Sequence, residues 1–207
     1  MPTPLFIAFE GGEGSGKSSQ IGRLADTLRQ DGHDVFATHE PGATSVGKAI
    51  RELVLETDEQ ITPRSEALLF AADRAHHVET EIKPSLAAGR IVLCDRYIDS
   101  SIAYQGAGRT LPTAAVARLS EWATGRLLPD LTVLLDIDPE HGLGRAQKRR
   151  DFDRLEREQL DFHERVRQGF LRLAHANPHR YLVLDGTRSV DELSQDIATE
   201  VRKRLAE

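Results

Sequence analysis

The sequence has little cysteine, no long apolar run and no excess of positive charge, and each shortage excludes a class of protein. Its 207 residues include one cysteine, Cys94, which cannot form an internal disulfide and gives no reason to expect an oxidising compartment. No apolar run approaches the roughly 20 residues needed to cross a bilayer, and the N-terminus resembles a first strand rather than a signal peptide. The net charge of −6 disfavours a general nucleic-acid binder, which is usually basic. We therefore expect a cytoplasmic protein that binds neither membranes nor nucleic acid.

Short apolar runs alternate with longer amphipathic stretches along the whole chain. The runs resemble buried parallel strands and lie at 5–9, 35–38, 91–94, 131–135 and 181–184. Helical patterns occupy roughly 17–31, 46–56, 64–88, 113–127, 139–149, 153–176 and 189–206. This order is typical of βαβ units, and it predicts an α/β fold with a five-stranded parallel sheet flanked by helices on both faces. No repeat or flexible linker divides the chain, so residues 1–207 are expected to form one domain.

A phosphate-binding motif follows the first predicted strand and opens the first predicted helix. The pattern is G-x-x-x-x-G-K-S, and this strand–loop–helix context identifies it as a P-loop. Glycines let the backbone turn so that several N–H groups converge on phosphate oxygens, and the helix N-terminus adds a favourable dipole. The lysine reaches the β and γ phosphates, and the final serine can bind Mg²⁺. The candidate ATP-binding residues are Gly11, Gly12, Glu13, Gly14, Ser15, Gly16, Lys17 and Ser18.

A carboxylate at a strand end is expected to complete the magnesium site. Asp95 ends the apolar run at 91–94 and is our candidate, together with Ser18, because P-loop enzymes need an acid there to hold the Mg²⁺ water shell. Asp136 also ends an apolar strand and is a rival, although it could instead cap the helix near Pro139.

Three other segments could hold a phosphoryl acceptor. The first is Glu40 and the loop after it, with Arg51 on the next helix. The second holds Phe70 and Arg74, whose i,i+4 spacing puts an aromatic ring and a guanidinium on one helix face, where they could stack on and hydrogen-bond a base. The third is the polar segment 95–106, at the strand edge where α/β sheets bind ligands. Considered alone, this pattern favours a core role for Phe70 and a surface ion pair for Arg74.

A basic segment lies between residues 145 and 157. It contains Arg145, Lys148, Arg149, Arg150, Arg154 and Arg157, mixed with acidic residues. By itself this pattern favours a solvated helix with ion pairs between successive turns.

Together these stretches resemble the bacterial thymidylate kinase family. The stretches are FEGGEGSGKS, EPGATSVGKAIR, LLFAADRAHHV, DRYIDSSIAYQG, LLDIDPEHGLGR and RRDFDRLE, and they follow the family's order over nearly the whole chain. The resemblance implies a P-loop NTPase fold with a short helical lid at about 143–157. It also implies ATP-dependent phosphorylation of dTMP to dTDP for dTTP biosynthesis, with Mg²⁺, in a homodimer.

The resemblance implies a role for each matching residue. Phe70 should stack on thymine, Arg74 should bond the base edge, and Ser101 should lie near the ring nitrogen. Arg51 and Arg96 should bind the monophosphate. Tyr104 should crowd the 2′ position of the sugar with Gln105 beside it, Glu13 should approach the 3′-hydroxyl, and Glu40 should order the acceptor site.

The resemblance also reinterprets the basic segment as a lid. The P-loop offers no basic side chain besides Lys17, as in family members that carry the transition-state arginine in the lid. Arg149 is the candidate for this catalytic role beside Lys17 and Asp95, with Arg145 and Arg150 as fallbacks. Arg145 is also a candidate ATP-binding residue. The sequence departs from the family's EPGGT at Ala43, which would be strained if its φ were positive.

Two other functions remain open at this point. One is another small P-loop kinase, for a different monophosphate or a deoxynucleoside, although two arginines at the acceptor site favour a monophosphate. The other is a nucleotide-binding regulatory switch, which would leave the acceptor-site residues unexplained and would need guanine-reading residues such as N-K-x-D, a run the sequence lacks.

Overall fold

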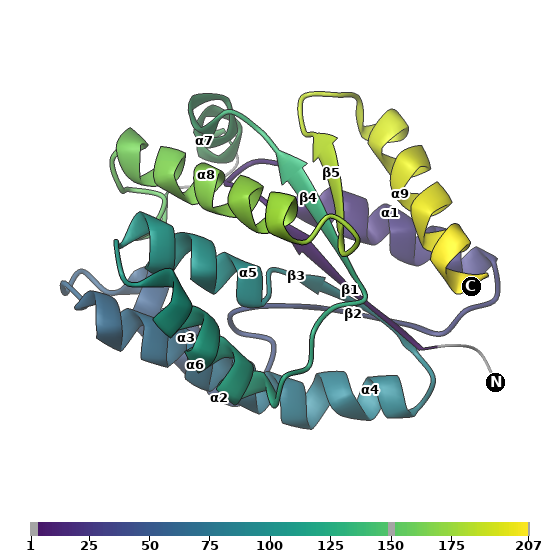
Figure 1. Cartoon of the computed structure of the whole chain (residues 1–207), viewed down its shortest axis with the longest axis horizontal. Coiled ribbons are helices and arrows are strands. Elements are labelled where there is room, and N and C mark those ends of the chain that lie inside the picture. Colours follow the sequence, from purple (N-terminus) through teal and green to yellow (C-terminus); the bar gives the residue numbers. More distant parts are fainter. Residues whose placement is uncertain (1–3, 149–151, 207) are drawn as a thin grey trace.

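The molecule is built on one parallel sheet of five strands in the order β2-β3-β1-β4-β5 (Figure 1). The computed structural model describes residues 4–148 and 152–206. All five predicted strands are confirmed, and each extends one residue further at its carboxyl end. The strands are β1 (Leu5–Glu10), β2 (Val35–His39), β3 (Ile91–Asp95), β4 (Leu131–Asp136) and β5 (Tyr181–Asp185). Each added residue is acidic or histidine, so the carboxyl edge of the sheet carries a row of polar side chains.

The two faces of the sheet pack against different helices because successive side chains of a strand point to opposite faces. Leu5, Ile7 and Phe9 of β1 lie in the core that includes α1 (Lys17–Gln30) and α9 (Val190–Leu205). On the other face, Phe6 and Ala8 pack near Val78 and Ile82. Figure 1 shows α1 and α9 on one side of the sheet and the remaining large helices on the other, which confirms the predicted layers.

Most predicted helices are present, two of them with a stretch of π-helix. The predicted helix at 46–56 is α2 (Ser45–Arg51) followed by η1 (Glu52–Glu56). The predicted helix at 64–88 is continuous through α3 (Pro63–His77), η2 (Val78–Ile82) and α4 (Lys83–Ala87). The predicted helices at 113–127 and 139–149 are α6 (Thr113–Thr124) and α7 (Pro139–Gln147).

Two parts of the helix prediction were wrong. The predicted helix at 153–176 begins only at α8 (Leu160–Ala176), because the Asp153 carboxylate accepts from the backbone N–H groups of Leu155 and Glu156 and holds a turn. A helix absent from the prediction, α5 (Ile98–Ser101) continued by η3 (Ile102–Gly108), packs along α8. Its serine- and glycine-rich sequence has weak helix propensity, so tertiary packing decides its conformation.

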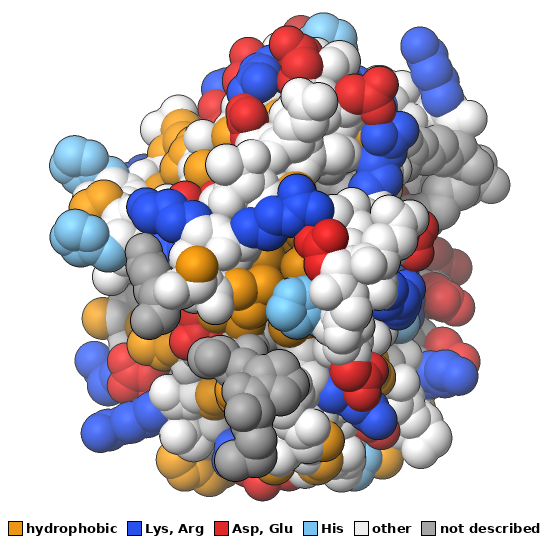
Figure 2. All heavy atoms as spheres, turned by 90° about the vertical axis from the view of Figure 1, so that its right-hand side faces the viewer, with side chains coloured by type: hydrophobic (Ala, Val, Ile, Leu, Met, Phe, Trp, Pro, Cys, Tyr) orange, Lys and Arg blue, Asp and Glu red, His pale blue; other side chains and the backbone are white. Residues whose placement is uncertain are grey.

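The surface beside α1 and α9 has no field of a single charge. Figure 2 shows acidic and basic side chains interspersed on this face. Within residues 4–148 and 152–206, no helix is both long and apolar enough to span a bilayer.

Candidate active site

The P-loop wraps around its own lysine between β1 and α1. Gly14 and Gly16 have φ angles of 62° and 98°, a region that favours glycine. Lys17 is 7% exposed, and its Nζ donates to the carbonyl oxygens of Gly11 and Gly12, both at 3.0 Å. Burial and the nearby Arg96 lower the pKa of Lys17. The lysine therefore lies inside the loop, within reach of any phosphate that binds there.

Ser18, the last residue of the P-loop, contacts Asp95 at the end of β3. The Ser18 hydroxyl donates to Asp95 Oδ2 at 2.7 Å. These are hard oxygen ligands of the kind that Mg²⁺ prefers, so the pair fits the predicted metal site. The rival Asp136 is engaged elsewhere, because both its oxygens accept from Arg167, at 2.7 and 2.9 Å.

Glu13 lies at the tip of the P-loop and faces two predicted acceptor residues. Its Oε1 accepts from Arg96 Nη2 at 2.8 Å and from the Tyr104 hydroxyl at 2.6 Å. Burial alone would raise its pKa, but the positive charges of Arg96 and Lys17 lower the pKa of Glu13 to about 2. Glu13 is therefore an anion at working pH. Arg96 has a φ of 66° and lies over the Tyr104 ring, 4.9 Å from its centroid.

The predicted base-binding residues converge from α3, the end of β2 and α5. Arg74 is 2% exposed, and its Nε donates to Glu40 Oε2 at 2.7 Å. Its Nη1 donates to the Ser101 hydroxyl at 2.9 Å. Phe70, one turn earlier on the same face, belongs to a core cluster and also lines the cavity beside these groups. The two interpretations of Phe70 are therefore compatible.

Arg51, Gln105 and Ala43 complete the acceptor side. Arg51 lines the cavity and donates to the Pro41 carbonyl at 3.0 Å. Gln105 lines it too, but its amide Nε2 is held by Glu66 Oε1 at 3.0 Å. Ala43 does not have a positive φ, so the departure from EPGGT introduces no backbone strain; Gly42 takes the left-handed conformation, with a φ of 104°.

Two arginines of the predicted lid, Arg145 and Arg154, lie among the described residues and make different contacts. Arg145 on α7 donates to the Gly186 carbonyl at 2.9 Å, and Ala146 beside it lines the larger cavity. Arg149 and Arg150 lie outside the described residues. Arg154 is held in place: its Nε donates to the Val54 carbonyl at 2.7 Å, and its Nη2 lies 2.5 Å from Glu66 Oε2.

Several buried residues near the site were missed from the sequence. Glu66 is fully buried and binds Gln105, Arg109 and Arg154. Glu66 and His77 share the helical spacing of Phe70 and Arg74, a signal that could have identified both. Glu10 ends β1 and accepts from the backbone N–H groups of Tyr97, after β3, and Ser100, in α5, contacts that no sequence pattern indicates.

Two adjoining cavities are formed by these residues. The larger cavity, of about 750 Å³, is lined by the P-loop, including Ser18, and by Asp95. The smaller, of about 110 Å³, contains Phe70 and Arg74. Among the described residues, four side chains line both cavities: Glu13, Glu40, Arg51 and Arg96. A phosphoryl group bound at the P-loop would thus face the contents of the smaller cavity across two guanidinium groups.

Comparison with known proteins agrees with this arrangement. The family model described as thymidylate kinase matches residues 9–197. The chain is 53% identical to a thymidylate kinase of Clavibacter michiganensis subsp. michiganensis, covering 99% of this chain and 97% of the relative. It is 52% identical to one from Deinococcus radiodurans, covering 99% of each chain.

A solved structure supports the same assignment. The crystal structure of thymidylate kinase from Ehrlichia chaffeensis superposes with a TM-score of 0.80 at 32% identity, covering 97% of this chain and 99% of that chain. The P-loop, the paired cavities and these similarities lead to one conclusion: the chain belongs to the thymidylate kinase family.

Proposed function

We propose that this chain transfers the γ-phosphoryl group of ATP to dTMP, which yields ADP and dTDP on the route to dTTP. The observation that carries the proposal is the sharing of Glu13, Glu40, Arg51 and Arg96 between the two cavities. A kinase must hold its acceptor in line with the γ-phosphate, and shared arginines at the junction suit two phosphates that approach each other. We treat residues 1–207 as one kinase domain.

On the donor side, the backbone N–H groups of the P-loop and Lys17 bind the phosphates of ATP. Lys17 then exchanges its bonds to the Gly11 and Gly12 carbonyls for phosphate oxygens. Ser18 and Asp95 are the residues that would hold Mg²⁺, which supplies charge neutralisation between the β and γ phosphates.

On the acceptor side, Arg51 and Arg96 bind the monophosphate, Phe70 stacks on thymine and Arg74 donates to the base edge. Glu13 is an anion close to the Tyr104 hydroxyl, so the two side chains form one wall suited to a sugar. Glu13 accepts from the 3′-hydroxyl, and Tyr104 leaves no room for a 2′-hydroxyl.

The bound acceptor also contacts polar groups that are already held in place. Ser101 and Gln105 line the base end of the cavity, and Glu40 holds Arg74. These groups cost little to order when dTMP binds, because their hydrogen bonds already restrict them.

The lid supplies the remaining charge. Arg149 bridges both phosphoryl groups in the transition state, while α7 brings Arg145 beside the P-loop: a Cβ built on Gly14 would lie 3.1 Å from that of Arg145. Arg154, held by Glu66, serves as an anchor for the lid rather than as a catalytic group.

The proposed homodimer uses the apolar face of α3 and α6, which pack together. Leu68 on α3 and Trp122 on α6 are 58% and 81% exposed, Leu53 on η1 is 55% exposed, and a second copy of the chain would cover them. Sedimentation of Trp122→Arg beside the wild type tests this. A cytoplasmic location is part of the proposal and is tested by cell fractionation.

The test of the function is a coupled assay of ADP release with dTMP, dUMP, dCMP, dGMP, thymidine or no acceptor. We expect fast turnover with dTMP alone or with dTMP far above the rest, and loss of turnover in a folded Lys17→Ala variant. Preference for another monophosphate or for thymidine would indicate a different small kinase. Hydrolysis of ATP that no acceptor stimulates would indicate a regulatory switch.

A further inference from the structure

A chain of buried hydrogen bonds runs from β2 to the base end of the smaller cavity. His77 on α3 connects the Thr38 hydroxyl, 2.7 Å from its Nε2, to Glu40 Oε1, 2.9 Å from its Nδ1. The other oxygen of Glu40 accepts from Arg74 Nε at 2.7 Å, and Arg74 Nη1 reaches Ser101 at 2.9 Å. His77 is fully buried, and the other four residues are at most 9% exposed.

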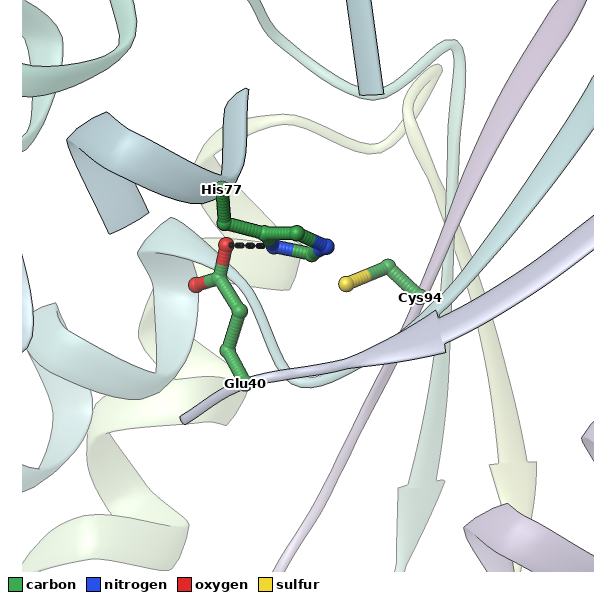
Figure 3. A group of neighbouring side chains, drawn as sticks. All are labelled: Glu40, His77 and Cys94. Carbon is green, nitrogen blue, oxygen red and sulfur yellow. Dashed lines mark hydrogen bonds and ion pairs between the residues drawn. The ribbon is translucent and has the colours of Figure 1, made fainter. Parts of the chain in front are cut away.

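Glu40, His77 and Cys94 could be taken for a metal site, because one ligand atom of each lies within 4.8 Å of the others (Figure 3). The contacts argue otherwise. Both ring nitrogens of His77 already have hydrogen-bond partners, and Glu40 forms an ion pair with the guanidinium of Arg74. The Cys94 thiol donates to the Arg96 carbonyl at 3.1 Å, and burial raises its pKa well above its usual value, which disfavours the thiolate form. In Figure 3 the dashed bond joins His77 to Glu40 and leaves Cys94 beside them.

The arrangement gives His77 control over Arg74. A guanidinium has donors in a rigid plane, so its orientation follows from the acceptors around it. Arg74 has three: Glu40 at Nε, Ser101 at Nη1 and the Tyr97 carbonyl at Nη2, 3.0 Å away. Glu40 is the only charged one of these three, and His77 and Arg74 hold its two oxygens. Without His77, Oε1 of the buried Glu40 would lose its donor, and the carboxylate would turn toward another one.

We propose that His77 is a positioning residue for base selection: through Glu40 it sets the plane of Arg74 and thereby the preference for thymine. This rests on the proposed function, in which the smaller cavity takes dTMP. Guanidinium N–H groups are donors only, so a correctly oriented Arg74 favours the carbonyl edge of thymine and disfavours the amino group of cytosine. The selectivity for dTMP over dCMP therefore reports the orientation of Arg74.

The test compares two amides that each imitate one nitrogen of the imidazole. His77→Asn places an amide near Nδ1 and can still donate to Glu40, whereas His77→Gln places it near Nε2 and can reach only Thr38. The measurement is kcat/KM for dTMP and for dCMP, with kcat at saturating dTMP and the melting temperature recorded separately. His76→Gln, next to it on the same helix and half-buried, is the matched control.

We expect His77→Gln to lower the dTMP-to-dCMP ratio by about 10-fold, the effect of losing one hydrogen bond to a charged group. Its kcat for saturating dTMP should stay within about 3-fold, because Arg74 does not contact the reacting phosphates. His77→Asn should restore most of the ratio, and His76→Gln should keep all of it.

An unchanged ratio in His77→Gln would overturn the proposal, and so would equal losses in His77→Asn and His77→Gln that follow the melting temperature. If His77→Gln does not fold, Thr38→Val provides the test, because it removes only the hydrogen bond between Thr38 and His77 Nε2. Thr38→Val should lower the dTMP-to-dCMP ratio about 3-fold. An unchanged ratio in this variant would count against the role of His77. A wild-type protein that does not phosphorylate dTMP would refute the proposed function instead. Failure of the proposed function is therefore distinguishable from failure of the proposal for His77.

Discussion

The Ser18 hydroxyl donates a 2.7 Å hydrogen bond to Asp95 Oδ2, which joins the first turn of α1 to the carboxyl end of β3. The bond places a hydroxyl and a carboxylate where a magnesium ion on the nucleotide phosphates would meet them. We predict that Asp95→Asn raises the Mg²⁺ concentration for half-maximal activity by about 10- to 100-fold, as the loss of a carboxylate near a metal commonly does. Titration of activity with Mg²⁺ at saturating ATP measures it.

Asp136→Asn is the matched control for this prediction. It changes a carboxylate at the end of β4, which β1 separates from β3, and this carboxylate is bound to Arg167. It should lower the melting temperature and leave the Mg²⁺ requirement alone. A larger shift in the Mg²⁺ requirement with Asp136→Asn than with Asp95→Asn would mean that the metal lies at the other strand end.

Phe70 should contribute both to dTMP binding and to the core. Phe70→Ala should weaken dTMP binding by about 1–3 kcal/mol through lost stacking, and it should also lower the melting temperature, because the ring packs in a buried cluster. Phe70→Leu refills most of the volume without an aromatic face. Calorimetry should find that leucine restores stability and leaves dTMP binding weak. Recovery of both by leucine would make Phe70 a packing residue only.

Arg149, the proposed catalytic arginine of the lid, should affect turnover rather than acceptor binding. Arg149→Ala should cut kcat by about 10³- to 10⁵-fold and leave the dTMP dissociation constant nearly unchanged, because the contact is strongest in the transition state. Steady-state kinetics of alanine variants at Arg145, Arg149 and Arg150 test this, with dTMP affinity from calorimetry. Wild-type kcat in all three variants would reduce the segment to a solvated face, and a loss confined to Arg150 would move the role by one residue.

Gly142 of α7 touches the backbone of the P-loop. A Cβ at Gly142 would lie 2.2 Å from the Glu13 carbonyl oxygen, whereas one at Gly144 would meet nothing within 4 Å. Gly142→Ala should therefore displace Glu13 and lower kcat, by on the order of 100-fold for a shift near 1 Å. Gly144→Ala, on the same helix, should keep kcat and stabilise the helix by up to about 1 kcal/mol. Equal kcat values for the two variants would show that the contact is unimportant.

Glu10 should make the folded protein less stable as the pH rises. Burial, helped by the charge of Asp99, raises the pKa of Glu10 from 4.5 to about 7. Between these values the folded chain holds a proton that the unfolded chain has lost, so the free energy of unfolding falls with rising pH. Glu10→Gln should flatten this fall in urea titrations at pH 5, 6 and 7. Some slope should remain, because the pKa of Asp73 is also raised, to about 6. An unchanged slope would contradict the shift.

Sequence patterns alone were enough to identify the strands and the donor site. Apolar runs bounded by turns identified all five strands, because a parallel sheet buried on both faces leaves few other places for such runs. The P-loop could also be identified from the sequence, because its eight residues from Gly11 to Ser18 are contiguous. The residue types in this motif follow from local physical requirements of phosphate binding. The shared face of Phe70 and Arg74 followed from helical spacing alone.

The partners of the carboxylates, in contrast, depend on the three-dimensional fold. Asp95 and Asp136 end similar strands, yet one faces Ser18 and the other is bound by Arg167. Arg154 looked like its neighbours in the basic segment until Glu66, 88 residues away, was found to hold it. Helical spacing could have placed Glu66 and His77 on the binding face, but not their partners. These pairings depend on contacts between segments distant in sequence, and the charge of a side chain does not reveal which opposite charge the fold will bring beside it.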